Sequence, residues 1–163
     1  MLCLSPRGKK SAHHPNWADE VAGVLLDTNV LSELMRPRPD VAVVAWFQQR
    51  PDLKIFTSVI TQAEILLGIA LLPGGRRRIA LAVAAEQMFK EEFAGRCLPF
   101  DHMAAAEYAL LIAARKKIGK PISTEDAQIA AIAMLHNLPL VTHNTKDFLL
   151  IENLQLIDPW ISK

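Results

Sequence analysis

The feature that most constrains the fold is the alternation of short apolar runs with longer segments of helical periodicity. The apolar runs are 24–27 (VLLD), 54–58 (KIFTS), 96–100 (RCLPF), 139–144 (PLVTHN) and 154–158 (LQLID). Short apolar strands without polar alternation are typical of parallel sheets that helices cover on both faces. The order of the segments therefore predicts an α/β fold, a three-layer sandwich with a short, mainly parallel central sheet.

Helical segments fill the intervals between these runs, and residues that break helices mark several of their ends. Pro37 and Pro39 follow the first helix, Pro73 follows the third, and Gly95 and Gly119 close two later ones. The predicted helices are 28–36, 41–50, 61–72, 76–93, 101–119 and 125–137, with a short helical turn at 145–150.

The chain of 163 residues is long enough for one domain with its own core, and 51% of its residues are hydrophobic. Residues 1–22 show no periodicity and lack the apolar segment of a signal peptide, so we expect an extension followed by a domain over 23–163. The longest apolar runs hold about 10 residues, too few to cross a membrane. Cys3 and Cys97 have neither metal-ligand nor redox spacing, which indicates a reduced, cytoplasmic chain.

Acidic side chains follow the predicted strands at the end where functional groups collect in an open parallel sheet. Asp27 ends the first strand, and Glu64 lies in the first turn of the helix after the second. Asp126 lies in the first turn of the helix before the fourth strand, and Asn144 and Asp147 follow that strand. Separate segments of the chain therefore deliver these side chains to the same edge of the sheet.

Each acidic residue, taken alone, also has a purely structural explanation. Asp27 is suited to cap the helix that follows it. The pairs Thr61 with Glu64 and Ser123 with Asp126 have the spacing of capping boxes. The sequence leaves capping and function open for each residue considered by itself.

Taken together, the carboxylates favour a metal site. Carboxylates that crowd at one edge repel one another. Glu64 shares a helical stripe with the apolar residues Ile60, Leu67 and Leu71, where an unpaired carboxylate is costly. Mg²⁺, which prefers hard oxygen ligands, would relieve both problems, whereas no His or Cys stands at the spacing of a zinc site.

A carboxylate cluster that holds Mg²⁺ is suited to the hydrolysis of phosphodiester bonds. The metal lowers the pKa of a water and stabilises charge that develops on the phosphate. The chain has no G-x-S-x-G sequence, no Cys–His signature and no P-loop. Acyl transfer through a serine or cysteine, and NTP hydrolysis, are therefore not supported.

Five segments carry a family resemblance: LLDTNVLSEL, TSVITQAEILLGIALL, LPFD, STEDAQIAAIAMLHNLPLVTHNTKDF and the terminal IDPW. In order and spacing they resemble the PIN-domain toxins of bacterial VapBC-type systems, in particular the FitB-like branch, over about residues 24–160. The resemblance implies a Mg²⁺- or Mn²⁺-dependent endoribonuclease that cuts single-stranded or looped RNA, often tRNA or rRNA. It also implies a cognate VapB- or FitA-like antitoxin, homodimer formation, and binding of promoter DNA only through the antitoxin.

The resemblance also assigns roles to the acidic residues. Asp27, Glu64 and Asp126 match the first three acids of the family, which implies that they hold the metal and that catalysis depends on them. The fourth catalytic position falls at Asn144 or Asp147. Some relatives have Asp where this chain has Asn144, and others have Asn there with Asp three residues later.

Several polar side chains near the acidic edge are candidates for contact with substrate or partner. Thr28 directly follows the first acid, and we expect its hydroxyl to contact a water or a phosphate. Arg36 and Arg38 lie just beyond the first helix and are candidates for contact with RNA or an antitoxin. Two other basic groups, 76–78 and 115–120, are better explained as solvated helix ends. Because the net charge is only +1, any contact with RNA depends on such local groups.

The helix pair at 61–93 carries more apolar residues than one core-facing stripe requires. The surplus indicates either a thick core or a surface that receives an antitoxin helix or a second copy of the chain.

Two other functions fit parts of the pattern. A catalytically weak PIN module, which binds RNA or a protein without cutting, would explain Asn144 but not the three intact acids. A phosphoryl-transfer domain with an aspartyl nucleophile is the other alternative. Its haloacid-dehalogenase form expects a second Asp where this chain has Asn29.

Overall fold

The structure is a computed structural model that describes residues 23–161, so the predicted extension over 1–22 lies outside the described residues. Its centre is a five-stranded parallel sheet in the order β3-β2-β1-β4-β5. The strands are β1 (Gly23–Leu26), β2 (Lys54–Ser58), β3 (Cys97–Leu98), β4 (Leu140–Val141) and β5 (Leu156–Ile157). The helices are α1 (Thr28–Leu34), α2 (Val41–Gln48), α3 (Val59–Ala70), α4 (Arg76–Gln87), the π-helical η2 (Met88–Glu92), α5 (His102–Lys117), α6 (Thr124–Leu135) and α7 (Thr145–Phe148).

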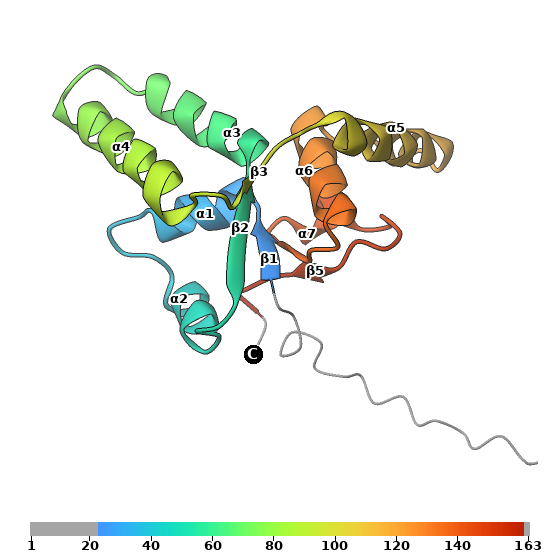
Figure 1. Ribbon diagram of the computed structural model, residues 1–163, viewed down its shortest axis with the longest axis horizontal. Coiled ribbons are helices and arrows are strands. Elements are labelled where there is room, and N and C mark those ends of the chain that lie inside the picture. Colours follow the sequence, from blue (N-terminus) through green and yellow to red (C-terminus); the bar gives the residue numbers. More distant parts are fainter. Residues whose placement is uncertain (1–22, 162–163) are drawn as a thin grey trace, which may run out of the picture.

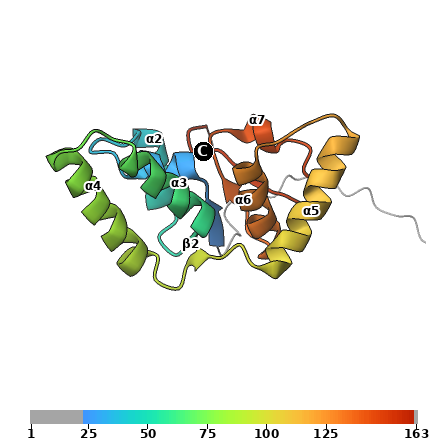
Figure 2. The same ribbon diagram turned by 90° about the horizontal axis from the view of Figure 1, so that it is seen from above.

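Helices cover both faces of the sheet, which confirms the predicted α/β sandwich. Helices α1 to α4 lie on one side of the central strands, and α5, α6 and α7 lie on the other (Figure 1, Figure 2). Helices α3 and α4 form a hairpin that projects away from the sheet, as the green ribbons of Figure 1 show. No helix within residues 23–161 is both long and apolar enough to cross a membrane.

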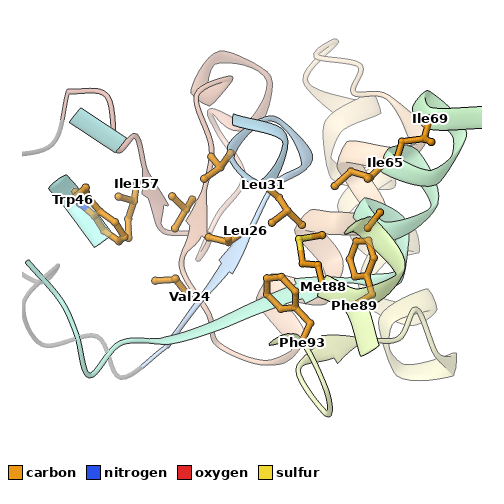
Figure 3. Close-up of a cluster of buried hydrophobic side chains, with 13 residues drawn as sticks. Val24, Leu26, Leu31, Trp46, Ile65, Ile69, Met88, Phe89, Phe93 and Ile157 are labelled. Carbon is orange, nitrogen blue, oxygen red and sulfur yellow. The ribbon is translucent and has the colours of Figure 1, made fainter. Parts of the chain in front are cut away.

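Alternate residues of β1 point to opposite faces and so belong to two separate cores. Val24 and Leu26 join the cluster formed with α1, α2, α3, α4 and η2, where Trp46 and Phe93 are also buried (Figure 3). Leu25 joins the cluster formed with α5 and α6. All three β1 side chains are at most 1% exposed, because helices bury the strand on both sides.

The register of the sheet brings several strand ends to one edge. Strand β1 pairs in parallel with β2 on one side and with β4 on the other, with Leu25 opposite Phe56 and Leu26 opposite Val141. Because the strands are parallel, the residues that end or follow them meet at this edge. These residues include Asp27, Ser58 and Thr142.

The elements differ from the predicted ones in three places. Helix α3 begins at Val59 because the hydroxyl of Ser58 accepts a hydrogen bond from the backbone N–H of Thr61 at 3.1 Å. Ser58 is thus the cap, and a capping box from Thr61 to Glu64 is wrong. The predicted helix 76–93 changes from α- to π-helical geometry at Met88, and strands β3, β4 and β5 have only two residues each.

Candidate active site at the end of strand β1

Asp27 lies directly after β1, and its buried side chain accepts three hydrogen bonds from the protein. Its Oδ1 accepts a hydrogen bond from the backbone N–H of Thr28 at 2.7 Å. Its Oδ2 accepts bonds from the Asn29 amide at 2.9 Å and from the Thr142 hydroxyl at 2.7 Å. Asp27 is therefore the N-cap residue of α1 and also a buried carboxylate held at three points, so its structural and functional explanations are compatible.

The environment of Asp27 disfavours its negative charge. Burial raises the pKa of Asp27 to about 6, against the opposing effect of the hydrogen bonds from Thr142 and Thr28. The negative charges of Asp126 and Glu64 raise this pKa further. The three acids that the sequence predicts for the site therefore lie within electrostatic reach of one another, at the same edge of the sheet.

Glu64 reaches the site from the second turn of α3. Its Oε2 accepts a short hydrogen bond from the Thr28 hydroxyl. The predicted buried stripe of this helix is wrong, because Leu67 and Leu71 are 59% and 76% exposed. The stripe that packs on the core instead contains Thr61, Ile65 and Ile69, spaced four residues apart, and Glu64 is only half-buried.

Asp126 lies in the first turn of α6, as predicted. Its backbone N–H donates to the Ser123 hydroxyl at 3.1 Å, so Ser123 caps this helix. Burial raises the pKa of Asp126, a hydrogen bond with Ser123 lowers it, and the charges of Asp147 and Glu125 raise it again. The charge of Asp126 thus raises the pKa of the buried acid Asp27, and the charge of the more exposed Asp147 raises the pKa of Asp126.

Asn144 and Asp147 form a pair at the predicted fourth position. The Asn144 amide donates a short hydrogen bond to Oδ2 of Asp147, and both side chains are exposed. Asn144 occupies the N-cap position of α7 without a side-chain capping bond. Its backbone N–H donates to the Thr142 hydroxyl at 3.0 Å, which ties this pair to the residue that also holds Asp27.

The residues that orient Asp27 were not identified from the sequence. Asn29 donates to Asp27 and to the Thr142 hydroxyl, while its own Oδ1 accepts from the His143 backbone N–H at 3.1 Å. Thr142 is fully buried. Thr142 is the polar residue that directly follows the apolar strand β4, and this position in the sequence is a signal for a site residue. The signal can be used only when β4 is known to lie beside β1, which the structure shows.

The residues predicted to contact substrate have different surroundings. The Thr28 hydroxyl is engaged with Glu64 and lies 3.2 Å from the Thr61 hydroxyl, so its partners here are protein groups. Arg36 is exposed and forms an ion pair with Glu33 at 3.0 Å. Arg38 is exposed and does not belong to the lining of the cavity that contains Glu64.

A trough leads from Glu64 along the inner side of the α3–α4 hairpin. One cavity of about 290 Å³ is lined at one end by Thr28 and Glu64 and also by Arg36 and Arg77. A second cavity of about 360 Å³, whose lining includes Phe93, shares Met35 and Leu81 with the first. Most of the other lining residues are apolar, so the trough is an apolar groove, and the cavity that contains Glu64 also has two arginines in its lining.

The donor set at this edge fits a hard divalent cation. Asp27 accepts three hydrogen bonds, which leaves about one of the four lone-pair positions of its carboxylate free. Within residues 23–161, no three His, Cys, Asp or Glu side chains stand close enough together to form a ready-made metal cluster. Mg²⁺ is usually held by one or two carboxylates and keeps several waters, so Asp27 with a neighbouring acid matches its requirements.

Comparisons with known proteins agree with the geometry. The family model described as PIN domain matches residues 24–153. Toxin FitB of Neisseria gonorrhoeae is 42% identical over 137 residues, which cover 84% of this chain and 98% of FitB. VapC ribonuclease Y4jK of Sinorhizobium fredii is 40% identical over 137 residues, which cover 84% of this chain and 97% of that protein.

Solved structures show the same fold. A structure of FitAB bound to the IR36 DNA fragment matches this chain with a TM-score of 0.77 and 40% sequence identity. The match covers 86% of this chain and 97% of the other. The similarity thus extends over nearly the whole of these relatives.

Proposed function

The chain belongs to the PIN-domain family, and on that premise we propose that it is a Mg²⁺-dependent endoribonuclease, the toxin of a type II toxin–antitoxin system. The observation that carries the proposal is the convergence of Asp27, Glu64 and Asp126, from three separate elements, at the end of β1. The ribonuclease name of a relative at 40% identity supports the reaction. A cytoplasmic RNA, such as tRNA or rRNA, is the proposed substrate.

In this proposal the three acids hold the cation, and the surrounding residues hold the acids. When bound, Mg²⁺, or Mn²⁺ in its place, supplies activation of a water and stabilisation of charge on the scissile phosphate. Thr142 and Asn29 orient the Asp27 carboxylate through its Oδ2. Asn144 and Asp147 complete the acidic edge, with Asp147 close enough to raise the pKa of Asp126.

The test compares RNA cleavage by the wild type and by Asp27→Asn, each with Mg²⁺ and with EDTA. We expect the wild type to cut RNA only with Mg²⁺ and Asp27→Asn to be nearly inactive, because it loses the central charged ligand. The matched control is Asp101→Asn, which replaces the capping carboxylate of α5 by another good capping residue. Equal cleavage by Asp27→Asn, or cleavage that EDTA leaves undiminished, would refute the mechanism.

The same experiment distinguishes the second function. A PIN module that binds RNA without cutting it would retain RNA in a filter-binding assay while a panel of RNAs, tRNAs included, stays intact. The replacement of an acid by Asn144 at the fourth position is the observation behind this alternative.

An antitoxin is the partner that we propose for the trough. The relative FitAB is a complex bound to DNA, which supports an antitoxin that carries the binding of promoter DNA. An amphipathic segment fits the trough, since its apolar side chains would cover Met35 and Leu81 while polar side chains meet Arg36 and Arg77. Arg38, which is exposed near Arg36, is a further candidate for contact with the antitoxin or with RNA.

A second copy of the chain is the partner that we propose for the outer face of the α3–α4 hairpin. On α3, Leu67 and Leu71 each come two residues after a core residue, Ile65 or Ile69. On α4, Ile79 and Val83 each come two residues after a residue that lines the trough, Arg77 or Leu81. Two residues along a helix correspond to a turn of about 200°, so these side chains lie opposite the trough. They are 58–76% exposed, an apolar patch that a homodimer would bury.

A further inference from the structure

A line of hydroxyl groups leads from the start of α3 to the carboxylate of Glu64. Ser58 and Thr61 are both fully buried. The Ser58 Oγ lies 3.3 Å from the Thr61 Oγ1, which lies 3.2 Å from the Thr28 Oγ1. The Thr28 hydroxyl in turn makes the short hydrogen bond to Glu64.

Counting protons gives this line a direction. Each hydroxyl has one proton to donate and two lone pairs to accept with. Thr28 donates its proton to the charged carboxylate of Glu64, the strongest acceptor within its reach, so it must accept from Thr61. Thr61 then accepts from Ser58, whose own oxygen accepts from the backbone N–H of Thr61 at 3.1 Å.

We propose that Thr61 and Ser58 are positioning residues that hold Glu64 in place for the acidic site through this hydroxyl chain. A donor at its oxygen fixes the rotation of the Thr28 hydroxyl, so that its single proton points to Glu64. Hydrogen bonds arranged in a chain also polarise one another, which strengthens the last bond to the carboxylate. The inference deepens the proposed function and rests on it.

A purely structural role does not explain the Thr61 hydroxyl. The cap of α3 uses the Ser58 hydroxyl and the Thr61 backbone N–H, and it is complete without the Thr61 side chain. Thr57, one residue before Ser58, is equally buried, and its hydroxyl has no hydrogen-bond partner within residues 23–161. A buried threonine in this part of the chain therefore need not have a hydrogen-bonded hydroxyl.

Thr57 provides a matched control for the experiment. The test variant is Thr61→Val, which removes the hydroxyl and keeps the shape, and the control is Thr57→Val, the same change at equal burial. For each protein, cleavage of RNA gives kcat and KM, and calorimetric titration with Mn²⁺ gives the affinity of the metal-free protein for a metal. We expect Thr61→Val to lose about 10- to 100-fold in kcat or in Mn²⁺ affinity, the range typical for groups that orient metal ligands, with KM for RNA unchanged.

The conservative variant and the control decide the outcome. Thr61→Ser restores the hydroxyl and should recover most of the loss, while Thr57→Val should behave as the wild type. Wild-type kcat and Mn²⁺ affinity in Thr61→Val, or an equal loss in Thr57→Val, would overturn the proposal.

A measurement that needs no RNA cleavage separates this proposal from the proposed function. A double-mutant cycle by urea unfolding combines Thr61→Val with Glu64→Gln, and the chain predicts that the two effects on stability are not additive. Additive effects would refute the positioning role. If the two effects are not additive but the wild-type protein cuts no RNA, the ribonuclease function is refuted. The coupling between Thr61 and Glu64 is then still established.

Discussion

At the scale of single residues, Thr142 is the side chain on which the most connections of the site depend. Its hydroxyl donates to Asp27 and accepts from the amide of Asn29 and from the backbone N–H of Asn144. It is fully buried, so water cannot replace these bonds. One hydroxyl therefore connects the end of β1 with the turn after β4.

The substitution Thr142→Val should lower both stability and activity. The change keeps the volume but leaves Asp27 and the Asn144 N–H short of a partner, and a buried polar group that loses its partner costs about 1–3 kcal/mol. Urea unfolding measures the first effect and RNA cleavage the second. Thr57→Val is again the comparison, since its hydroxyl has no partner within residues 23–161 to lose. A variant with wild-type stability would show that the Thr142 bonds contribute little.

At the scale of elements, a buried arginine attaches the last turn of α5 to the segment around α7. Arg115 is 6% exposed, which contradicts its interpretation as part of a solvated helix end. Its guanidinium donates to the carbonyl oxygens of Leu149, of Asp147 at 3.2 Å and of Pro121 at 3.4 Å. The backbone of the fourth acidic position is thus held by a residue of a distant helix.

Removal of this attachment should destabilise the domain. Arg115→Met leaves three carbonyl oxygens without their charged donor, and hydrogen bonds to charged groups contribute about 1.5–3 kcal/mol. We expect a loss of that size in urea unfolding. The matched control, Lys116→Met, changes the exposed next residue of the same turn and should stay near the wild type. Equal stability of the two variants would contradict the role given to Arg115.

The start of α4 carries three successive arginines, of which Arg77 alone lines the trough. Positive charge at the N-terminus of a helix is unfavourable, because the helix dipole is positive there. A negatively charged partner in the trough would compensate for this cost, and RNA phosphate is such a partner when no antitoxin segment fills the trough. Arg77 is therefore the member of the group that we expect to contact the substrate.

Single substitutions within this group test that expectation. In the inactive Asp27→Asn protein, Arg77→Ala should weaken RNA binding and reduce the slope of log affinity against log salt by about 0.7, the value for one phosphate contact on a single strand. Arg76→Ala and Arg78→Ala are the controls, as both side chains are exposed outside the trough lining. If all three variants bind RNA equally weakly, the arginines act through their total charge and the position of Arg77 in the trough has no special role.

At the scale of the whole molecule, the α3–α4 hairpin presents two apolar faces. The inner face borders the trough, and the outer face contains Leu67, Leu71, Ile79 and Val83. Of the apolar residues of this helix pair, Ile65, Ile69 and Met88 are therefore part of the core, whereas Leu66, Ile79 and Val83 lie on the surface. The hairpin is placed to contact one partner on each face.

The outer face predicts an effect on assembly. Replacement of Leu71 and Val83 together by Gln should shift sedimentation of the protein from dimer to monomer, since it places two amides in an interface that is otherwise apolar. Unfolding of the isolated chain should change little, because both side chains are exposed. The control is Leu110→Gln, an equally exposed leucine on α5. A dimer that persists would assign the self-contact to another surface.

The order of the elements and the sandwich fold follow from the sequence alone, and the sequence also predicts the three acids of the candidate site. Hydrophobic periodicity and breakers such as Gly119 act locally, and a residue that follows a strand in a parallel sheet must lie at its carboxyl edge. Asp27 is predicted for this reason, and Glu64 and Asp126 because the helices that carry them begin at the same edge. The family resemblance added the same three residues on independent grounds.

The support of these acids depends on how the chain packs in three dimensions. Thr142 meets Asp27 and Asn29 because β4 lies beside β1, and a strand order that is not sequential cannot be derived from local pattern. Likewise, the burial of Arg115 and the connection of Thr61 with Thr28 depend on contacts between residues more than 30 positions apart. A polar side chain in a sequence shows what it can bond to, but only packing determines which partners come within reach.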